Sequence, residues 1–220
     1  MRKVTLIFAI FLMFLSANAQ EKTKNIVRNF QLNLGVTLGD YSFKSDQGKV
    51  DYKPQVGFRI GADNVFFTKN KFSLESGLTF SWLRTKVDEP TIKIDYSSFY
   101  VGTHLVGNYA IYQDKLFIGA GPFIDFGLFG TQKPEGSESI DLFVGKDGND
   151  APLKRLNYGV DFRLLGDISS TYPIQAYVSY RLGIPNIEGA DGGSGQTFKA
   201  SIISFGVRAN LHKIFEKKSE

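Results

Sequence analysis

The feature that most constrains this chain is a two-residue alternation of apolar with small or polar side chains. It is clearest over residues 72–82, where Phe72, Leu74, Leu78, Phe80 and Trp82 alternate with Ser73, Glu75, Gly77, Thr79 and Ser81. Successive side chains of a β-strand point to opposite faces, so this segment is predicted to be a strand with two chemically different faces. The same period recurs over residues 30–39, 56–62, 96–109, 116–128, 157–164, 174–183 and 203–211. Eight such strands predict an all-β fold.

The connections between the predicted strands alternate in length. Three are short, at residues 66–71, 110–115 and 167–173, and four are longer and more polar, at residues 41–53, 84–95, 130–154 and 184–197. Short turns at one end and long loops at the other are typical of bacterial outer-membrane barrels with periplasmic termini. We therefore predict a closed antiparallel up-and-down transmembrane β-barrel of about eight strands over residues 30–215, with ten strands as the alternative count.

Alternation by itself also fits a soluble barrel with an apolar interior, such as a lipocalin. The charges favour the membrane form, because small residues and ionisable side chains of both signs share the polar faces and can pair in a narrow lumen. The residues predicted for this lumen are Arg59, Glu75, Asp125, Asp161, Arg163, Arg181 and Arg208. They are interpreted as a structural network in a filled interior rather than an ion path, so an open pore is not expected.

Aromatic residues near the strand ends predict two belts at the membrane interfaces. Phe66, Phe67, Phe72, Tyr112 and Tyr172 fall near the short turns, and Tyr41, Phe43, Tyr52, Trp82 and Tyr96 fall near the long loops. This distribution predicts outer-membrane lipid as the surroundings of the barrel.

Residues 1–19 have the pattern of a cleaved secretory signal peptide. Arg2 and Lys3 precede an apolar run from Val4 to Leu15 that is shorter than the roughly 20 residues of a membrane helix. The chain has no Cys, so neither a lipid anchor at the cleavage site nor a disulfide framework is expected. Residues 20–29 are then a short periplasmic segment and residues 216–220 a charged tail, and the predicted location is the outer membrane.

Three segments rich in glycine and aromatic residues carry a resemblance to a known family. They read LFIGAGPF at residues 116–123, YRLGIPNI at residues 180–187 and ISFGVR at residues 203–208. Together they resemble the PorT-like outer-membrane barrel proteins common in Bacteroidetes. The resemblance implies a barrel with a structural or interaction role, since most members lack an assigned activity. It also implies an alternative role in type IX protein secretion, with other envelope or secretion proteins as partners.

Motifs for chemistry are weak in this chain. The only two histidines, His104 and His212, lack a second histidine at ligand spacing, so no metal site is predicted. His104 shares a strand with Ser97 and Ser98, but no motif supplies the acid of a hydrolytic triad. The glycine-rich loop at residues 189–195 and the acidic loop at residues 147–150 miss the spacing of phosphate and calcium loops.

Charge gives no support for nucleic acid either, since the net charge of +4 falls to +2 without Arg2 and Lys3. We therefore expect no enzyme, no cofactor and no nucleic-acid partner. A small-ligand-binding or lipid-modifying barrel remains a further alternative.

Overall fold

A computed structural model describes residues 29–45, 48–50, 52–89, 92–113, 115–144, 151–169, 171–189, 197–210, 212 and 214. The predicted signal peptide, residues 20–28, the charged tail and the acidic loop at residues 147–150 lie outside the described residues, as does most of the glycine-rich loop. Within the described residues, no helix is long and apolar enough to cross a membrane.

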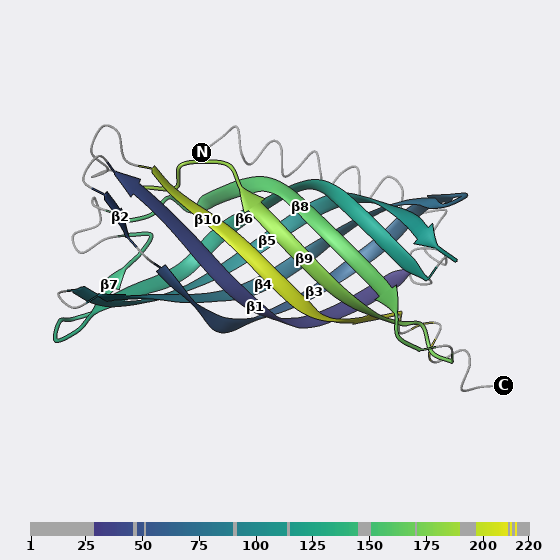
Figure 1. Ribbon diagram of the computed structural model, residues 1–220, viewed down its shortest axis with the longest axis horizontal. Coiled ribbons are helices and arrows are strands. Elements are labelled where there is room, and N and C mark those ends of the chain that lie inside the picture. Colours follow the sequence, from purple (N-terminus) through teal and green to yellow (C-terminus); the bar gives the residue numbers. More distant parts are fainter. Residues whose placement is uncertain are drawn as a thin grey trace.

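Eight long antiparallel strands form a closed ring (Figure 1). They are β1 (Phe30–Ser45), β3 (Tyr52–Lys69), β4 (Phe72–Glu89), β5 (Ile92–Tyr112), β6 (Leu116–Pro134), β8 (Leu156–Asp167), β9 (Ile174–Gly183) and β10 (Thr197–Ala209). Each strand pairs with its neighbours in the sequence, and β10 pairs with β1 from Ala209 opposite Leu32 to Thr197 opposite Lys44. The predicted closed up-and-down barrel is therefore confirmed, and its closure satisfies the backbone without an open edge.

Two further strands are short and lie outside the ring. β2 (Gly48–Val50) pairs with β1, and β7 (Ile140–Asp141) pairs with β6. Both lie at the left-hand end of the barrel in Figure 1, which is the end of the long connections. The last strand ends at Ala209, before the predicted limit of residue 215, and the Ile214 N–H donates to the Asn210 carbonyl at 3.2 Å in a turn.

The short-turn end is built from tight reversals. Asn70 and Gln113 adopt positive φ values of 53° and 44°, which such turns require and which Asn accepts more easily than most residues. The long-loop end differs from the prediction at residues 84–95. There β4 and β5 continue to pair as far as Glu89 opposite Ile92. These polar residues therefore form a hairpin above the apolar part of the barrel rather than an irregular loop.

The side-chain faces divide the barrel into two parts. In the lower part, from the short turns to Trp82 on β4, apolar side chains face outward, and most inward side chains are polar, with apolar exceptions such as Val106, Phe123 and Leu165. Leu34, Leu78 and Ile124 are 57%, 63% and 51% exposed, whereas the inward Glu75 and Asp161 are fully buried. An apolar band of this extent suits lipid and not water, which excludes the soluble alternative.

In the upper part the same alternation is reversed. Leu83 and Val87 are buried inside the ring, while Arg84 and Lys86 face outward. The inward residues pack with side chains from the long connections into one cluster, which we call the apolar cap: Tyr41, Leu83, Val87, Tyr96, Tyr100, Leu142, Phe143, Leu153, Ile187, Phe198, Ala200 and Ile202. The cap fills the barrel mouth above the polar lumen.

Candidate functional site

The candidate site is the polar lumen, where eight charged side chains are buried. They form four cations and four anions, and we call them the lumen network: Arg59 and Asp63 on β3, Glu75 on β4, Asp125 on β6, Asp161 and Arg163 on β8, Arg181 on β9 and Arg208 on β10. All seven residues predicted from the sequence lie in this network. Because the four cations and four anions cancel, the lumen has no net charge when His104 is uncharged.

Arg163 and Arg208 hold the lower half of the network together. Arg163 Nη1 lies 2.6 Å from Glu75 Oε1 and Arg163 Nη2 lies 2.9 Å from Asp161 Oδ2. Arg208 Nη1 lies 2.8 Å from the other Glu75 oxygen, and its Nε donates to Gln175 Oε1 at 2.7 Å. Both oxygens of Glu75 are therefore paired with a guanidinium.

Arg181 organises the upper half. Its Nη1 lies 2.6 Å from Asp125 Oδ1 and its Nε lies 3.2 Å from Asp161 Oδ2. Its guanidinium carbon lies 5.0 Å from the centroid of the Phe123 ring, so the cation is also covered by an aromatic face. Asp161 thus joins the two halves, because Arg163 and Arg181 share its Oδ2.

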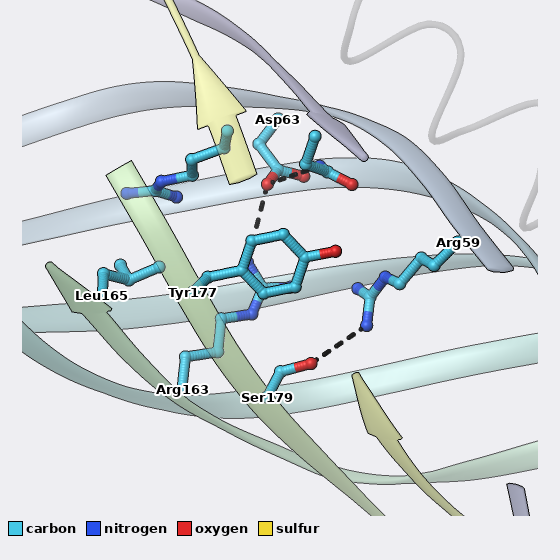
Figure 2. Close-up of a pocket in the computed structure, with 8 residues that line it drawn as sticks. Arg59, Asp63, Arg163, Leu165, Tyr177 and Ser179 are labelled. Carbon is cyan, nitrogen blue, oxygen red and sulfur yellow. Dashed lines mark hydrogen bonds and ion pairs between the residues drawn. The ribbon is translucent and has the colours of Figure 1, made fainter. Parts of the chain in front are cut away.

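Arg59 is the least tightly paired cation of the network. It lies 3.9 Å from Asp161 and donates to Ser179 Oγ at 3.2 Å. Figure 2 shows this side chain across a small void from Arg163 and Tyr177. The void measures about 10 Å³, which is room for about one water molecule. Its size is far below that of an ion path.

His104 and Asp63 are members of the site that sequence reasoning missed. His104 Nε2 lies 3.1 Å from Asp63 Oδ1, and Asp63 Oδ2 accepts from Asn33 Nδ2 at 3.0 Å. Asp63 is one step beyond the alternation that was read as ending at Ala62, so continuing the period by one residue would have found it.

The expected absence of a hydrolytic triad stays a prediction. Ser98 instead pairs with the Tyr41 hydroxyl at 2.8 Å, and Ser97 accepts from Trp82 Nε1 at 2.8 Å.

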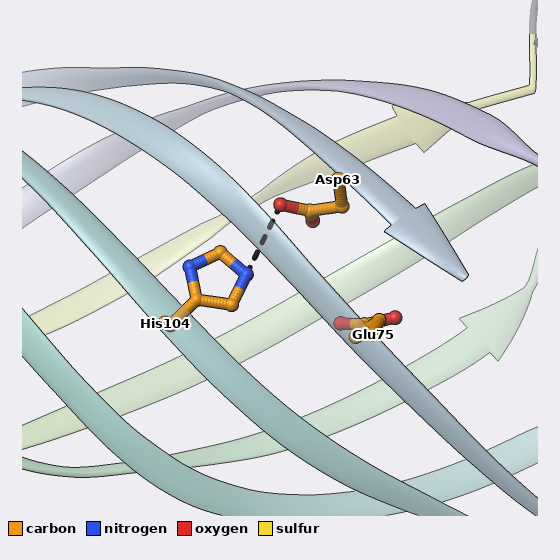
Figure 3. Close-up of side chains that lie close together, drawn as sticks. All are labelled: Asp63, Glu75 and His104. Carbon is orange, nitrogen blue, oxygen red and sulfur yellow. Dashed lines mark ion pairs between the residues drawn. The ribbon is translucent and has the colours of Figure 1, made fainter. Parts of the chain in front are cut away.

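Asp63, Glu75 and His104 together resemble a set of metal ligands (Figure 3), with one ligand atom of each within 4.8 Å of the others. Two guanidinium groups occupy the Glu75 oxygens at 2.6 and 2.8 Å, and Arg163 lies 3.6 Å from Asp63. A cation would have to compete with both arginines in a buried space. The donor set therefore fits an ion-pair network better than a metal centre.

Small residues on adjacent strands make room for the network. At Gly102, a Cβ would lie 1.7 Å from Asp125 Oδ1, so a larger residue there would have to displace this carboxylate. At Gly77 a Cβ would likewise lie 2.1 Å from Asp63 Oδ1, so glycine at these two inward positions leaves room for two carboxylates of the network.

The aromatics predicted for the short-turn interface and Trp82 lie on the outer surface. In contrast, Tyr41 and Tyr96, predicted for the long-loop interface, are buried in the apolar cap, and Phe43 and Tyr52 pack against it. Phe66, Phe67, Phe72, Tyr112 and Tyr172 are between 39% and 59% exposed near the short turns. Phe66 and Phe67 lie at an irregularity in the pairing of β3 with β4, between Val65 and Phe67. Trp82 lies at the opposite border of the apolar band and is half-buried by neighbouring rings.

Residues 18–188 of the chain match a family described as outer membrane protein beta-barrel domain. No curated protein sequence matches the chain.

Among solved structures, Neisserial surface protein A (NspA) matches with a TM-score of 0.53 and 12% identity, over 83% of this chain and 97% of that one. The attachment invasion locus protein Ail of Yersinia pestis, solved with the heparin analogue sucrose octasulfate, gives 0.41 and 14% over 82% and 99%. The outer membrane protease OmpT of Escherichia coli gives 0.41 and 8% over 82% and 96%. At this identity, the NspA match shows a common fold and nothing beyond it.

Proposed function

Because this chain belongs to the family of outer membrane protein beta-barrel domains, we propose that it is a closed, non-conducting barrel that holds an interaction surface in that membrane. The family match and the common fold show that the chain is located in the outer membrane, which confirms the location predicted from the sequence. The long-loop end is then the surface that other envelope components contact, and the role is structural or interactive rather than enzymatic.

One observation carries this proposal, namely that the barrel is filled along its length. In the part of the chain that the structure describes, the lumen network occupies the lower part of the barrel around a void of about 10 Å³, and the apolar cap closes the upper part with Leu142 and Ile187 fully buried. Water needs polar partners to occupy an interior, and the cap has few to offer. The same filling gives little support to a small-ligand site in the lumen.

Conductance tests the proposal directly. The full chain, reconstituted in a planar bilayer, is expected to leave the membrane at its background conductance over the applied voltages. A porin reconstituted in the same bilayer is the positive control. Stepwise single-channel currents from this chain would overturn the proposal.

A role in a secretion apparatus of type IX kind is the second candidate, and it is supported by the segments at residues 116–123, 180–187 and 203–208 that resemble PorT-like proteins. Deleting the gene and assaying the export of secreted proteins distinguishes the two roles. Unchanged export would remove the secretion role and leave the closed barrel as proposed.

A further inference from the structure

Four aromatic side chains form a ladder on the outer surface of β3, β4, β5 and β6. Phe58, Trp82, Phe99 and Phe129 are consecutive cross-strand partners. The Trp82 and Phe99 rings stack with an interplanar angle of 8° and centroids 5.7 Å apart, and the Phe99 and Phe129 centroids are 4.5 Å apart. We call these four residues the aromatic ladder.

The aromatic ladder lies where the apolar band ends on β4, β5 and β6, and on β3 only Val56 extends the band beyond Phe58 on the long-loop side. On three other strands the last outward apolar residue is aliphatic, namely Leu38 on β1, Leu156 on β8 and Ile203 on β10. Aromatic rings are favoured at the depth where acyl chains meet headgroups. One side of the barrel therefore presents a rigid aromatic surface at this depth.

Basic side chains lie immediately above the aromatic ladder. The Arg84 guanidinium carbon is 5.2 Å from the centroid of the Trp82 ring, and Lys86 occupies the next outward position on β4. Lys53 is the cross-strand partner of Lys86 on β3, and Lys133 occupies the same row on β6.

Two carboxylates lie among these four cations, Asp88 and Asp95, so the surface keeps a net charge of +2. Lys86 and Lys53 lie 3.1 and 3.4 Å from Asp88 and lower the pKa of its carboxyl group. Within the described part of the chain, no carboxylate lies within 4.0 Å of Arg84 or Lys133. These two cations are therefore available to an anion from outside the protein.

We propose that this face binds an anionic, phosphate-bearing lipid of the surrounding leaflet. The acyl chains lie on the aromatic ladder, and the phosphate is bound by Arg84 and Lys133, the two cations of this face that have no carboxylate partner among the described residues. The apolar band around the site is covered by lipid, so a lipid headgroup is the anion that reaches this depth. A guanidinium pairs with phosphate through two parallel hydrogen bonds, which makes Arg84 the main contact.

The chain offers a direct reporter, because Trp82 is its only tryptophan. The full chain is folded into phosphatidylcholine vesicles that contain a minor fraction of lipid with brominated chains, either phosphatidylglycerol or phosphatidylcholine. Bromine quenches Trp82 on contact. We expect stronger quenching by brominated phosphatidylglycerol, with a preference of about fivefold for each contributing cation.

Variants localise the effect. Arg84→Gln and Lys133→Gln are each expected to lower the preference for phosphatidylglycerol by about fivefold. The matched control is Lys199→Gln, which removes an exposed cation from the outer face of β10, beyond Ile203, and should leave the preference unchanged. Each variant is compared with itself in vesicles without bromine, and heat-modifiable gel mobility verifies that it is folded.

Three outcomes would overturn the proposal. Equal quenching by the two brominated lipids would show that the face does not select the headgroup. An equal loss in Lys199→Gln and Arg84→Gln would show a general effect of surface charge. Weak quenching by both lipids would show that protein, such as a second copy of the chain, covers the ladder. None of these outcomes bears on whether the barrel conducts.

Discussion

At the scale of single residues, the lumen is stable only if every buried charge keeps its partner. Removing charges from water costs several kcal/mol for each ion, and close pairing offsets this cost. Glu75 is the clearest example, because its two carboxylate oxygens lie 2.6 Å from Arg163 Nη1 and 2.8 Å from Arg208 Nη1 and so pair with both cations. Loss of this one carboxylate would leave one excess positive charge in a closed interior.

Glu75→Gln is therefore expected to lower the free energy of unfolding by about 3–5 kcal/mol. Chemical denaturation in detergent micelles or vesicles, followed by Trp82 fluorescence, measures the change. Glu135→Gln is the matched control, because Glu135 pairs with Lys93 at 3.1 Å but is 68% exposed. The control should change stability by less than about 1 kcal/mol. A similar effect of both substitutions would contradict the role assigned to Glu75.

At the scale of elements, the connection between β6 and β8 closes the barrel mouth. β7 pairs with Thr131 and Gln132, and this places Leu142 and Phe143 inside the ring. The Phe143 ring then occupies the space beside Gly127, where a Cβ would lie 2.4 Å from the ring. Backbone bonds from Leu142 to Gly130 at 3.0 Å and from Leu153 to Leu142 at 2.8 Å hold the segment in place. The apolar cap is thus a small core in which side chains from the upper ends of the strands pack around four residues of the long connections, namely Leu142, Phe143, Leu153 and Ile187.

Leu142→Ala should loosen the cap by at least about 2 kcal/mol, because truncating a buried leucine leaves a cavity. Hydrogen exchange at the Leu153 amide, which bonds to the Leu142 carbonyl, should accelerate by about 30-fold or more. The amides of β8 and β9 should be unaffected. Val144→Ala, at a side chain that is 42% exposed, is the control and should change little. Unchanged protection in Leu142→Ala would show that the cap does not depend on this residue.

At the scale of the whole molecule, one ring of strands is surrounded by lipid along its lower part and by water along its upper part. Where lipid surrounds the ring, apolar side chains face outward and charges gather inside. Where water surrounds it, charges face outward and the apolar cap gathers inside. The pairing of β1 with β10 stabilises both arrangements of side chains, because a closed ring has no free strand edge at which it can open.

Closure can be tested with cysteines, because the chain contains none of its own. Leu34 and Val207 are cross-strand partners on β1 and β10. Their Cα atoms should lie about 4.5–5.5 Å apart, within reach of a disulfide. Leu34→Cys with Val207→Cys should therefore cross-link on oxidation and change mobility on a denaturing gel.

The control for this experiment combines Leu34→Cys with Ile203→Cys. Ile203 is the partner of Leu38 and not of Leu34, so these two cysteines are separated along the strands by about 13 Å. This pair should remain reduced. Cross-linking of the control alone would mean that the ring closes in a different register.

The sequence by itself determined the strands, their closed arrangement and seven of the eight charges in the lumen. It could do so because the alternation within each strand reflects whether lipid or water contacts the outer face of that strand, and no other part of the chain is needed to recognise it. It did not reveal Asp63, His104 as its partner, or the extension of β4 and β5 above the apolar band.

Only the tertiary structure decided which charges pair. Arg163 and Glu75 are 88 residues apart in the chain, and they meet because ring closure brings β8 and β4 across one narrow lumen. The apolar cap depends on the same closure, since Leu142 and Ile187 come from connections that show no alternation. Contacts across a closed interior depend on the register of all the strands together, and this register cannot be inferred from the sequence of any single strand.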